Sequence, residues 1–254
     1  MLEQQKNALI TGGASGIGLA ISTHLAEQGY KVWVSDIQLQ AAQVAALQIN
    51  SHALQLDVTQ QDQIDAAVAT IQAADGRLDL LINNAGIQHV AAIEDFSADK
   101  WRLVNDVLLV GPAMLTRGFL PLMRSHNYGR IINIGSIHAL VGSPFKSAYV
   151  AAKHGLLGFS KVVALETASQ DITINTICPA YVKTPLVDKQ IADQAKRHGI
   201  SEEDVINNIM LEPMPKKSFI SVAEICGSVD YLVSDVARNV TAQSMVIDGA
   251  WTAR

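Results

Sequence analysis

The sequence has little cysteine and few charged side chains. Its two cysteines, Cys178 and Cys226, stand far apart and lie in no CxxC pair or Cys/His cluster. We therefore expect no metal site and no disulfide framework, but two buried thiols. Charged residues make up 17% of the chain and hydrophobic residues 49%, which indicates a globular protein with a well-filled interior.

The chain also lacks a basic patch, a long apolar run and a linker. A formal net charge of -5 and a pI near 5.8 argue against a nucleic-acid partner. The N-terminal stretch MLEQQKNALI has no apolar signal core, and no apolar run reaches the roughly 18 residues of a membrane span. No Pro/Gly/Ser-rich or like-charged stretch divides the sequence. We expect a soluble, cytoplasmic protein without a membrane or nucleic-acid partner, folded as a single domain over residues 1–254.

Strand-like and helix-like segments alternate along most of the chain. The expected strands are residues 7–11, 31–36, 52–56, 78–82, 130–135, 172–177 and 245–248, and the expected helices are residues 19–28, 40–50, 60–74, 101–123, 147–168 and 221–232. Strands joined by helices of this length pair in parallel through right-handed crossovers. The pattern predicts an α/β fold, a doubly wound parallel sheet with helices on both faces. Residues 185–220 break the alternation, and we expect them to form a small helical lid over the site.

A glycine-rich loop, TGGASGIG, directly follows the first expected strand. Gly12, Gly16 and Gly18 would let the backbone turn tightly, approach a pyrophosphate and pack the next helix against the strand. The phosphates would sit at the N-terminus of that helix. Because a strand precedes the loop and a helix follows it, the loop predicts a dinucleotide-binding site.

Two aspartates follow the next two strands. Asp36 lies 18 residues beyond Gly18, where a carboxylate can accept hydrogen bonds from both ribose hydroxyls but would repel a 2′-phosphate. No arginine or lysine in the glycine loop or just after Asp36 offsets that charge, so we expect NAD rather than NADP. Asp36 could also be the N-cap of the helix that starts near Leu39. Asp57 has a similar pair of interpretations, an acceptor for the adenine amino group or a cap for the helix over residues 60–74.

A serine, a tyrosine and a lysine lie close together in the sequence. Ser136 follows the strand over residues 130–135, and Tyr149 and Lys153 are four residues apart at the start of a helix, so they project from one face. An ammonium about 4 Å from a phenol would favour the phenolate by about 4 kcal/mol at an effective dielectric of about 20. Lys153 would then lower the pKa of Tyr149 so that it exchanges a proton with a substrate oxygen, which Ser136 would hydrogen-bond. Taken alone, the motif also fits an ordinary helix with a surface lysine and a half-buried tyrosine.

Together these motifs resemble the classical short-chain dehydrogenase/reductase family. The resemblance spans the whole chain, and its motifs are, in order, TGGASGIG, Asp36, Asp57, NNAG from Asn83 to Gly86, Ser136, Tyr149, Lys153, and Pro179 with Thr184. It implies a Rossmann-type sheet of about seven strands and hydride transfer between a nicotinamide cofactor and a carbon whose oxygen is held by the catalytic residues Ser136, Tyr149 and Lys153. The cofactor-binding residues that it implies are Gly12, Ser15, Gly16, Ile17, Gly18, Asp36, Asp57, Val58, Asn84, Ala85, Gly86, Tyr149, Lys153, Pro179, Val182 and Thr184.

Within the family, the chain resembles the bacterial (R)-3-hydroxybutyrate dehydrogenases. The substrate-binding residues implied, besides Ser136 and Tyr149, are Gln88, His138, Lys146, Tyr181, Gln190 and Trp251. Lys146 would offer a positive charge to a carboxylate, the glutamines and the histidine would donate hydrogen bonds, and the two aromatic residues would form apolar walls. This implies NAD-dependent interconversion of (R)-3-hydroxybutyrate and acetoacetate, a reaction of ketone body metabolism. Alternatives are another small ketone or a longer 3-oxo acid as substrate and, for each polar residue alone, a solvated loop side chain.

One position departs from the family. Where the family has a catalytic asparagine, seven residues after Trp101, this chain has Leu108. In family accounts, the carbonyl at this position holds a water that links Lys153 to solvent, and leucine could still do so, while Asn105 is a candidate substitute for the side chain. Loss of the side-chain hydrogen bonds would cost about 1 to 3 kcal/mol, a rate loss of roughly ten- to a hundredfold. A dinucleotide-binding protein with impaired turnover is therefore a third hypothesis.

The two longest expected helices bear on assembly. The helices over residues 101–123 and 147–168 resemble those that form tetramer contacts in the family, so we expect a homotetramer. Small residues of the second helix, among them Ala151 and Gly155, permit close helix approach. Packing against the sheet explains them equally well.

Overall fold

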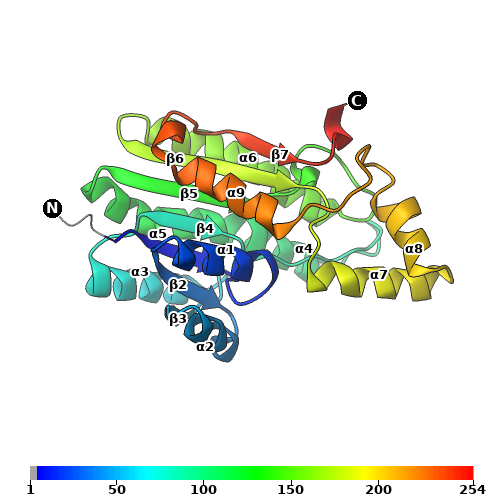
Figure 1. Cartoon of the computed structure of the whole chain (residues 1–254), viewed down its shortest axis with the longest axis horizontal. Helices are drawn as coiled ribbons and strands as arrows, with labels where there is room; N and C mark the ends of the chain where they lie inside the picture. The colour runs from blue at the N-terminus through cyan, green and yellow to red at the C-terminus, as the bar shows by residue number, and fades with distance from the viewer. Residues whose placement is uncertain (1–4, 254) are drawn as a thin grey trace.

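One sheet of seven parallel strands runs through the protein, in the order β3-β2-β1-β4-β5-β6-β7 (Figure 1). The computed structural model describes residues 5–253, except for the side chains of residues 185, 186, 189, 197 and 198. Residues 1–4, the start of the stretch considered for a signal sequence, lie outside the described residues. The strands are β1 (Asn7–Thr11), β2 (Lys31–Asp36), β3 (His52–Gln55), β4 (Leu80–Asn83), β5 (Tyr128–Ile134), β6 (Asp171–Pro179) and β7 (Ser244–Ile247). The predicted doubly wound parallel sheet is confirmed.

Most of the strands are buried on both faces. Every residue of β1 and β4 is buried, and so is all of β6 after its first residue. A parallel sheet covered by helices on both sides buries its strands in this way. At the edge of the sheet, β3 is only partly buried, because it has a neighbour on one side only. Each expected strand lies within two residues of the observed one at both ends.

Helices cover both faces of the sheet (Figure 1). Side chains alternate along a strand, so Ala8 and Ile10 of β1 join one hydrophobic cluster and Leu9 joins the other. The first cluster is covered by α1 (Gly16–Glu27), α2 (Leu39–Gln48) and α9 (Val222–Val233). The second is covered by α3 (Gln61–Asp75), α4 (Ala98–Asn105), α5 (Gly111–Ser125) and α6 (Ser147–Glu166). Two further helices, α7 (Pro185–His198) and α8 (Glu202–Val205), lie in the segment expected to form a lid.

The helix expected over residues 101–123 is longer and less regular than predicted. It runs from Ala98 to Ser125, and α4 passes into α5 through one π-helical turn, Asp106–Val110. Hydrophobic spacing predicts a helix here but does not distinguish this turn from an ordinary α-helical one, because the two differ by a single hydrogen-bond register.

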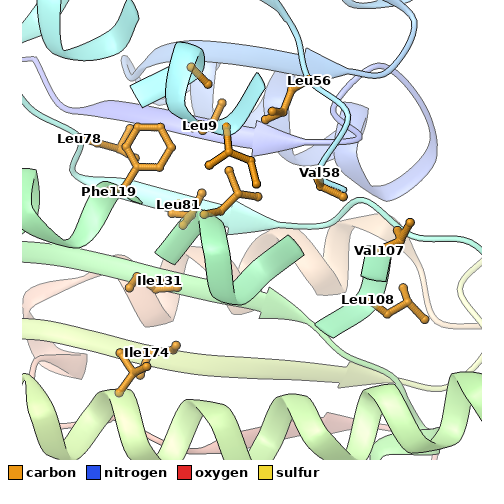
Figure 2. Close-up of a cluster of buried hydrophobic side chains, with 14 of the residues drawn as sticks. Leu9, Leu56, Val58, Leu78, Leu81, Val107, Leu108, Phe119, Ile131 and Ile174 are labelled. Carbon is orange, nitrogen blue, oxygen red and sulfur yellow. The ribbon is translucent and has the colours of Figure 1, made fainter. Parts of the chain in front are cut away.

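By length and composition, this helix is also apolar enough to cross a membrane, with a mean hydropathy of 1.3. The sequence analysis expected no uninterrupted apolar run of this length. The helix nevertheless has a high mean hydropathy, because the mean is taken over apolar and scattered polar residues together. Its apolar side chains Val107, Leu108 and Phe119 lie in the hydrophobic core beside the sheet (Figure 2). Core helices of globular proteins can be equally apolar, and 39% of the most apolar window of this helix is buried inside the protein.

All seven strands end at the same edge of the sheet, because all pair in parallel. The chain moves outward from β1 to β3 and then returns to β4 on the other side of β1. Open α/β sheets bind ligands at the carboxyl ends of the strands where the order reverses in this way. α7 and α8 lie at this edge (Figure 1). Every segment that the sequence marked for chemistry therefore leads to one side of the protein.

Candidate active site

The glycine loop after β1 is built for close backbone approach. Gly12 and Gly16 have φ of +59° and +53°, in the left-handed region that favours glycine. A Cβ on Gly18 would lie 2.1 Å from the carbonyl oxygen of Gly12, so no other residue fits there. Ser15, the N-cap of α1, is exposed and its side chain makes no capping hydrogen bond. The loop thus presents the N-terminus of a helix, which suits an anion such as a pyrophosphate.

The turn after β4 is fastened to this loop. Asn84 Nδ2 donates to the carbonyl oxygens of Thr11 and Gly12, at 2.9 and 3.0 Å. The backbone N–H groups of Asn84 and Ala85 both donate to Thr11 Oγ1, at 3.0 Å each. Thr11 was missed by the sequence analysis, and the available signal was a hydroxyl residue immediately before the glycines. These bonds hold the two loops rigidly on either side of the point where the strand order reverses.

Asp36 is the last residue of β2 and Asp57 follows the neighbouring strand β3, and neither caps a helix as its alternative interpretation required. The N-caps of α2 and α3 are Gln38 and Gln60. Asp36 Oδ1 instead accepts from the N–H of Gln38, at 3.1 Å. Asp57 Oδ1 accepts from the N–H and hydroxyl of Thr59, at 2.9 and 2.7 Å, in a local turn. Each carboxylate keeps a second oxygen for which the structure shows no such bond.

The next residue, Val58, has its side chain in the hydrophobic core and only its main chain at the loop (Figure 2). A Cβ on Gly111, at the start of α5, would lie 2.8 Å from the carbonyl oxygen of Val58. The Val58 side chain is therefore occupied by core packing.

Ser136, Tyr149 and Lys153 meet where β5 ends and α6 begins. Ser136 Oγ accepts from the N–H of His138 at 3.1 Å, which fixes the serine at the start of a short 3-10 turn. Lys153 is buried, its Nζ donates to the carbonyl oxygen of Ile134 at 2.6 Å, and it lies 5.7 Å from the ring centroid of Tyr149. The predicted shared face of the tyrosine and the lysine is confirmed.

The expected acidity of the tyrosine is not found. Burial raises the pKa of Tyr149, and the Ser136 side chain opposes that rise only in part. Burial also lowers the pKa of Lys153 to about 8. The predicted direction was wrong because the loss of water around the buried phenol outweighs the effect of the lysine charge, and Lys153 Nζ donates to the Ile134 carbonyl oxygen.

Cys178 is a neighbour that the sequence analysis did not connect with these residues. Its thiol is buried, as is that of Cys226, which confirms the prediction for both. A Cβ on Gly135 would lie 3.0 Å from Cys178 Sγ, which places the thiol just beneath Ser136. Burial raises the pKa of Cys178 to about 11, so the thiol stays neutral beside Lys153.

Four of the predicted substrate residues come together beside Tyr149. Lys146 Nζ lies 3.2 Å from His138 Nε2. The His138 ring packs edge-on against Tyr149 and Trp251, with centroids 6.2 and 5.8 Å apart, and Trp251 stacks with Tyr181 at 6.1 Å. Burial and the Lys146 charge lower the pKa of His138 to about 4, so the histidine is neutral at neutral pH. This cluster of side chains, the candidate pocket, has a positive charge at one side and aromatic rings beside it.

Gln88 and Gln190 are less closely tied to this pocket. Gln88 is exposed in the loop after β4, and a backbone bond of 3.0 Å from Ala91 N–H to the Phe145 carbonyl joins that loop to the segment before Lys146. Gln190 is half-buried on α7. Among the described residues, the structure shows no hydrogen bond from either glutamine side chain to the pocket.

The segment between β6 and α7 carries the remaining cofactor candidates. Pro179 is the buried last residue of β6, and Val182 pairs with Ile220 in an isolated bridge. Thr184 is the N-cap of α7, and its hydroxyl accepts from the N–H of Val187 at 3.4 Å. All three predicted residues thus lie at the carboxyl edge of the sheet.

Leu108 lies in the π-helical turn and is buried in the core (Figure 2). Its Cδ2 would be 3.3 Å from a Cβ on Gly86, so it reaches the turn after β4. Pro112 has no N–H, so the Leu108 carbonyl receives no bond from that position. Asn105 Nδ2 donates to the carbonyl oxygen of Trp101 at 2.9 Å, within its own helix. That bond speaks against Asn105 as a substitute for the family asparagine.

Comparison with known proteins bears on this arrangement. A sequence model described as short chain dehydrogenase matches residues 6–195. Two proteins named D-beta-hydroxybutyrate dehydrogenase are similar: one from Rhizobium meliloti (strain 1021) is 45% identical, covering 98% of this chain and 99% of that protein, and one from Cupriavidus necator is 41% identical, covering 98% of each. A solved actinorhodin polyketide ketoreductase with NADPH has a TM-score of 0.92 and 29% identity, covering 98% of both chains. The family model spans most of the chain and the relatives match it end to end, so this protein belongs to the short-chain dehydrogenase family and is an oxidoreductase.

Proposed function

We propose that this oxidoreductase interconverts (R)-3-hydroxybutyrate and acetoacetate with NAD. The observation that carries the proposal is the Lys146–His138 pair beside Tyr149, with Lys146 Nζ 3.2 Å from His138 Nε2 and the histidine ring 6.2 Å from the tyrosine ring. A positive charge next to an acid/base tyrosine suits a substrate whose carboxylate is one CH₂ away from its alcohol carbon. The two relatives that carry the name D-beta-hydroxybutyrate dehydrogenase support this substrate.

The chemistry would centre on proton transfer by Tyr149. In the direction of reduction, the raised pKa of Tyr149 keeps its hydroxyl protonated, ready to give a proton to the oxygen of acetoacetate. The Ser136 hydroxyl would donate a hydrogen bond to the same oxygen. Lys153, buried against the tyrosine ring, would stabilise the phenolate left behind and hold the nicotinamide ribose. The nicotinamide, when bound, supplies the hydride.

The residues present fit a dinucleotide. Only glycine is possible at Gly18, and the exposed N-terminus of α1 suits a pyrophosphate. The Asp36 carboxylate would accept from the ribose hydroxyls and repel a 2′-phosphate, which supports NAD. The further cofactor residues would be those predicted from the sequence, namely Ser15, Ile17, Asp57, the Val58 backbone, Asn84 to Gly86, Pro179, Val182 and Thr184.

The substrate would lie between the nicotinamide and residues 185–220, which we propose act as a lid in a single domain. Lys146 and His138 would hold its carboxylate, with Gln88 and Gln190 donating further hydrogen bonds on lid closure. Tyr181 and Trp251, stacked at 6.1 Å, would limit the length of the carbon chain.

The direct test is reduction of NAD by (R)-3-hydroxybutyrate, with the (S) enantiomer and NADP as controls. In the reverse direction, acetoacetate is compared with 3-oxovalerate and with an uncharged ketone. We expect NAD, the (R) enantiomer and acetoacetate to be preferred. Equal rates with the uncharged ketone would show that the enzyme acts on a different small ketone.

Leu108 favours a second candidate, a dinucleotide-binding protein with impaired turnover. Its buried side chain offers no hydrogen bond where the family has an asparagine. Under the first proposal, the Leu108 carbonyl would hold the water that links Lys153 to solvent, and Leu108→Asn should raise turnover by roughly tenfold without changing NADH binding. A protein that binds NADH by fluorescence but shows no turnover with NAD and a 3-hydroxy acid would support the second candidate.

We also propose a cytoplasmic homotetramer. α5 and α6 form a groove lined by apolar residues such as Met114, Leu120 and Phe159. A second copy of the chain could cover this apolar groove. Light scattering of the purified protein measures the mass of the assembly.

A further inference from the structure

The C-terminal turn, residues 248–253, is held by one carboxylate. Asp248 follows β7 at the same edge of the sheet as the candidate site and is buried. Its Oδ1 accepts from the N–H of Ala250 at 2.9 Å, and its Oδ2 accepts from the N–H and hydroxyl of Thr252 at 2.8 and 2.7 Å. The N–H of Trp251 donates to the Asp248 carbonyl oxygen at 3.2 Å. Both carboxylate oxygens are thus used within the turn.

The backbone of this turn is unusual. Gly249 and Ala250 have φ of +57° and +72°, so an alanine adopts a conformation that L residues rarely take. The Gly249 carbonyl oxygen accepts from the N–H of Lys216 at 3.1 Å, and a Cβ on Gly249 would lie 3.2 Å from Lys216 and Met214. The turn is therefore fastened at one end to the segment after the lid helices, and the Asp248 hydrogen bonds hold the strained residue in place.

The turn delivers Trp251 into the candidate pocket. The Trp251 ring lies 5.8 Å from the His138 ring and 6.1 Å from the Tyr181 ring, centroid to centroid. These two partners come from β5 and β6 loops, more than 60 residues away in the sequence. The two ring contacts hold the indole from the pocket side, and the turn fixes the backbone from which the Trp251 side chain extends.

We propose that Asp248 is a positioning residue that sets the size selectivity of the pocket by holding Trp251 in place. The substrate part of this proposal rests on the proposed 3-hydroxybutyrate activity. Asp248 need not touch substrate, because its two oxygens are already occupied. Its effect travels through the backbone between residues 248 and 252 to the indole ring.

A spectroscopic experiment tests the positioning without any substrate. Trp33→Phe and Trp101→Phe leave Trp251 as the single tryptophan. In that background, Asp248→Asn and Thr252→Val each remove part of the hydrogen bonding, and acrylamide quenching of Trp251 should rise roughly twofold because the turn opens to solvent more often. Thr252→Ser keeps the hydroxyl and should restore the original quenching.

A matched control lies at the other end of the sheet. Asp79 is buried, its Oδ2 accepts from the N–H of Asn7 at 2.8 Å and its Oδ1 forms an ion pair with Arg77, so Asp79→Asn disturbs a buried carboxylate far from the pocket. It should destabilise the protein without changing the quenching of Trp251. If Asp248→Asn and Thr252→Val leave the quenching unchanged, or change it no more than Asp79→Asn does, the positioning role is wrong.

The kinetic experiment tests selectivity. The ratio of kcat/KM for (R)-3-hydroxybutyrate to that for (R)-3-hydroxyhexanoate should fall by roughly tenfold in Trp251→Ala, and by a smaller factor in Asp248→Asn and Thr252→Val. In the Trp251→Ala background, Asp248→Asn should change the ratio no further. A further change in the double variant, or loss of kcat with an unchanged ratio in the single one, would contradict the selectivity role.

The two experiments separate this proposal from the proposed function. A wild-type protein that oxidises neither acid disproves the 3-hydroxybutyrate activity, whereas the quenching series still decides whether Asp248 positions Trp251.

Discussion

The two ends of the candidate site are built by different means. At the candidate dinucleotide end, the loop backbone is held in a close-packed shape: the Asn84 side-chain amide donates to the carbonyls of Thr11 and Gly12, and Gly18 has no room for a Cβ. At the substrate end, side chains from separate loops meet, as in the Lys146–His138 pair. Backbone offers the same N–H and C=O groups everywhere, which suits a constant cofactor, whereas side chains supply the charge and shape that distinguish one substrate from another.

The largest effect is expected at Tyr149, where the two ends of the candidate site meet. Tyr149→Phe keeps the ring contact with His138 but removes the hydroxyl that exchanges the proton. We expect kcat to fall by roughly a thousandfold, within the range for loss of an acid/base group, while NADH binding is unchanged. Retained oxidation in this variant would overturn the proposed chemistry.

The dinucleotide end should tolerate no side chain at Gly18. Gly18→Ala places a Cβ 2.1 Å from the Gly12 carbonyl oxygen, so the glycine loop must shift. NADH affinity, followed by fluorescence, should fall by roughly a hundredfold, about 3 kcal/mol. Gly227→Ala is the matched control, because a Cβ there meets no atom within 4 Å on α9 and should leave NADH binding unchanged. Unaltered affinity in Gly18→Ala would mean that this loop does not bind the cofactor.

The substrate end should respond to loss of charge. Lys146→Ala removes the ammonium beside His138, and we expect KM for acetoacetate to rise roughly ten- to a hundredfold, as for a lost charge-assisted hydrogen bond. The affinity for NADH should hardly change. Lys161→Ala, at an exposed position of α6, controls for net charge. Equal losses of acetoacetate and NADH binding in Lys146→Ala would contradict the division between the two ends.

The smallest effect expected is on stability against pH. The pKa of His138 is lowered to about 4 from its ordinary 6.5, so the folded state favours the neutral ring and the unfolded state binds the proton first. Stability from this residue is present above pH 6.5 and is lost as the pH falls toward 4. Thermal unfolding across this range should show a shallower decline in His138→Gln than in the wild type. If stability falls equally steeply with pH in the variant and the wild type, His138 is not the residue responsible for the pH dependence.

Much of the fold follows from local sequence. Strands β1 and β6 are buried almost throughout because both faces of the sheet are covered, and the helices between the strands are long enough to favour parallel pairing. The π-helical turn at residues 106–110 was not predictable in this way, because a hydrophobic pattern does not encode one hydrogen-bond register against the next.

Part of the candidate site was also predictable from local sequence. The glycine loop, Ser136 and the tyrosine–lysine pair follow strand ends or share a helix turn, so short spacings in the sequence locate them. Thr11 and Asp248 were missed, since each acts through hydrogen bonds to backbone atoms that only the folded turns bring within reach.

By itself, the sequence determined the parallel sheet, the glycine loop and the residue types of the candidate site, because these depend on neighbours a few residues apart. Only the tertiary structure decided that burial raises the pKa of Tyr149, and that Trp251 meets His138 across more than a hundred residues of chain. Desolvation and ring packing depend on which distant segments fill the space around a group, and that is a property of the folded protein.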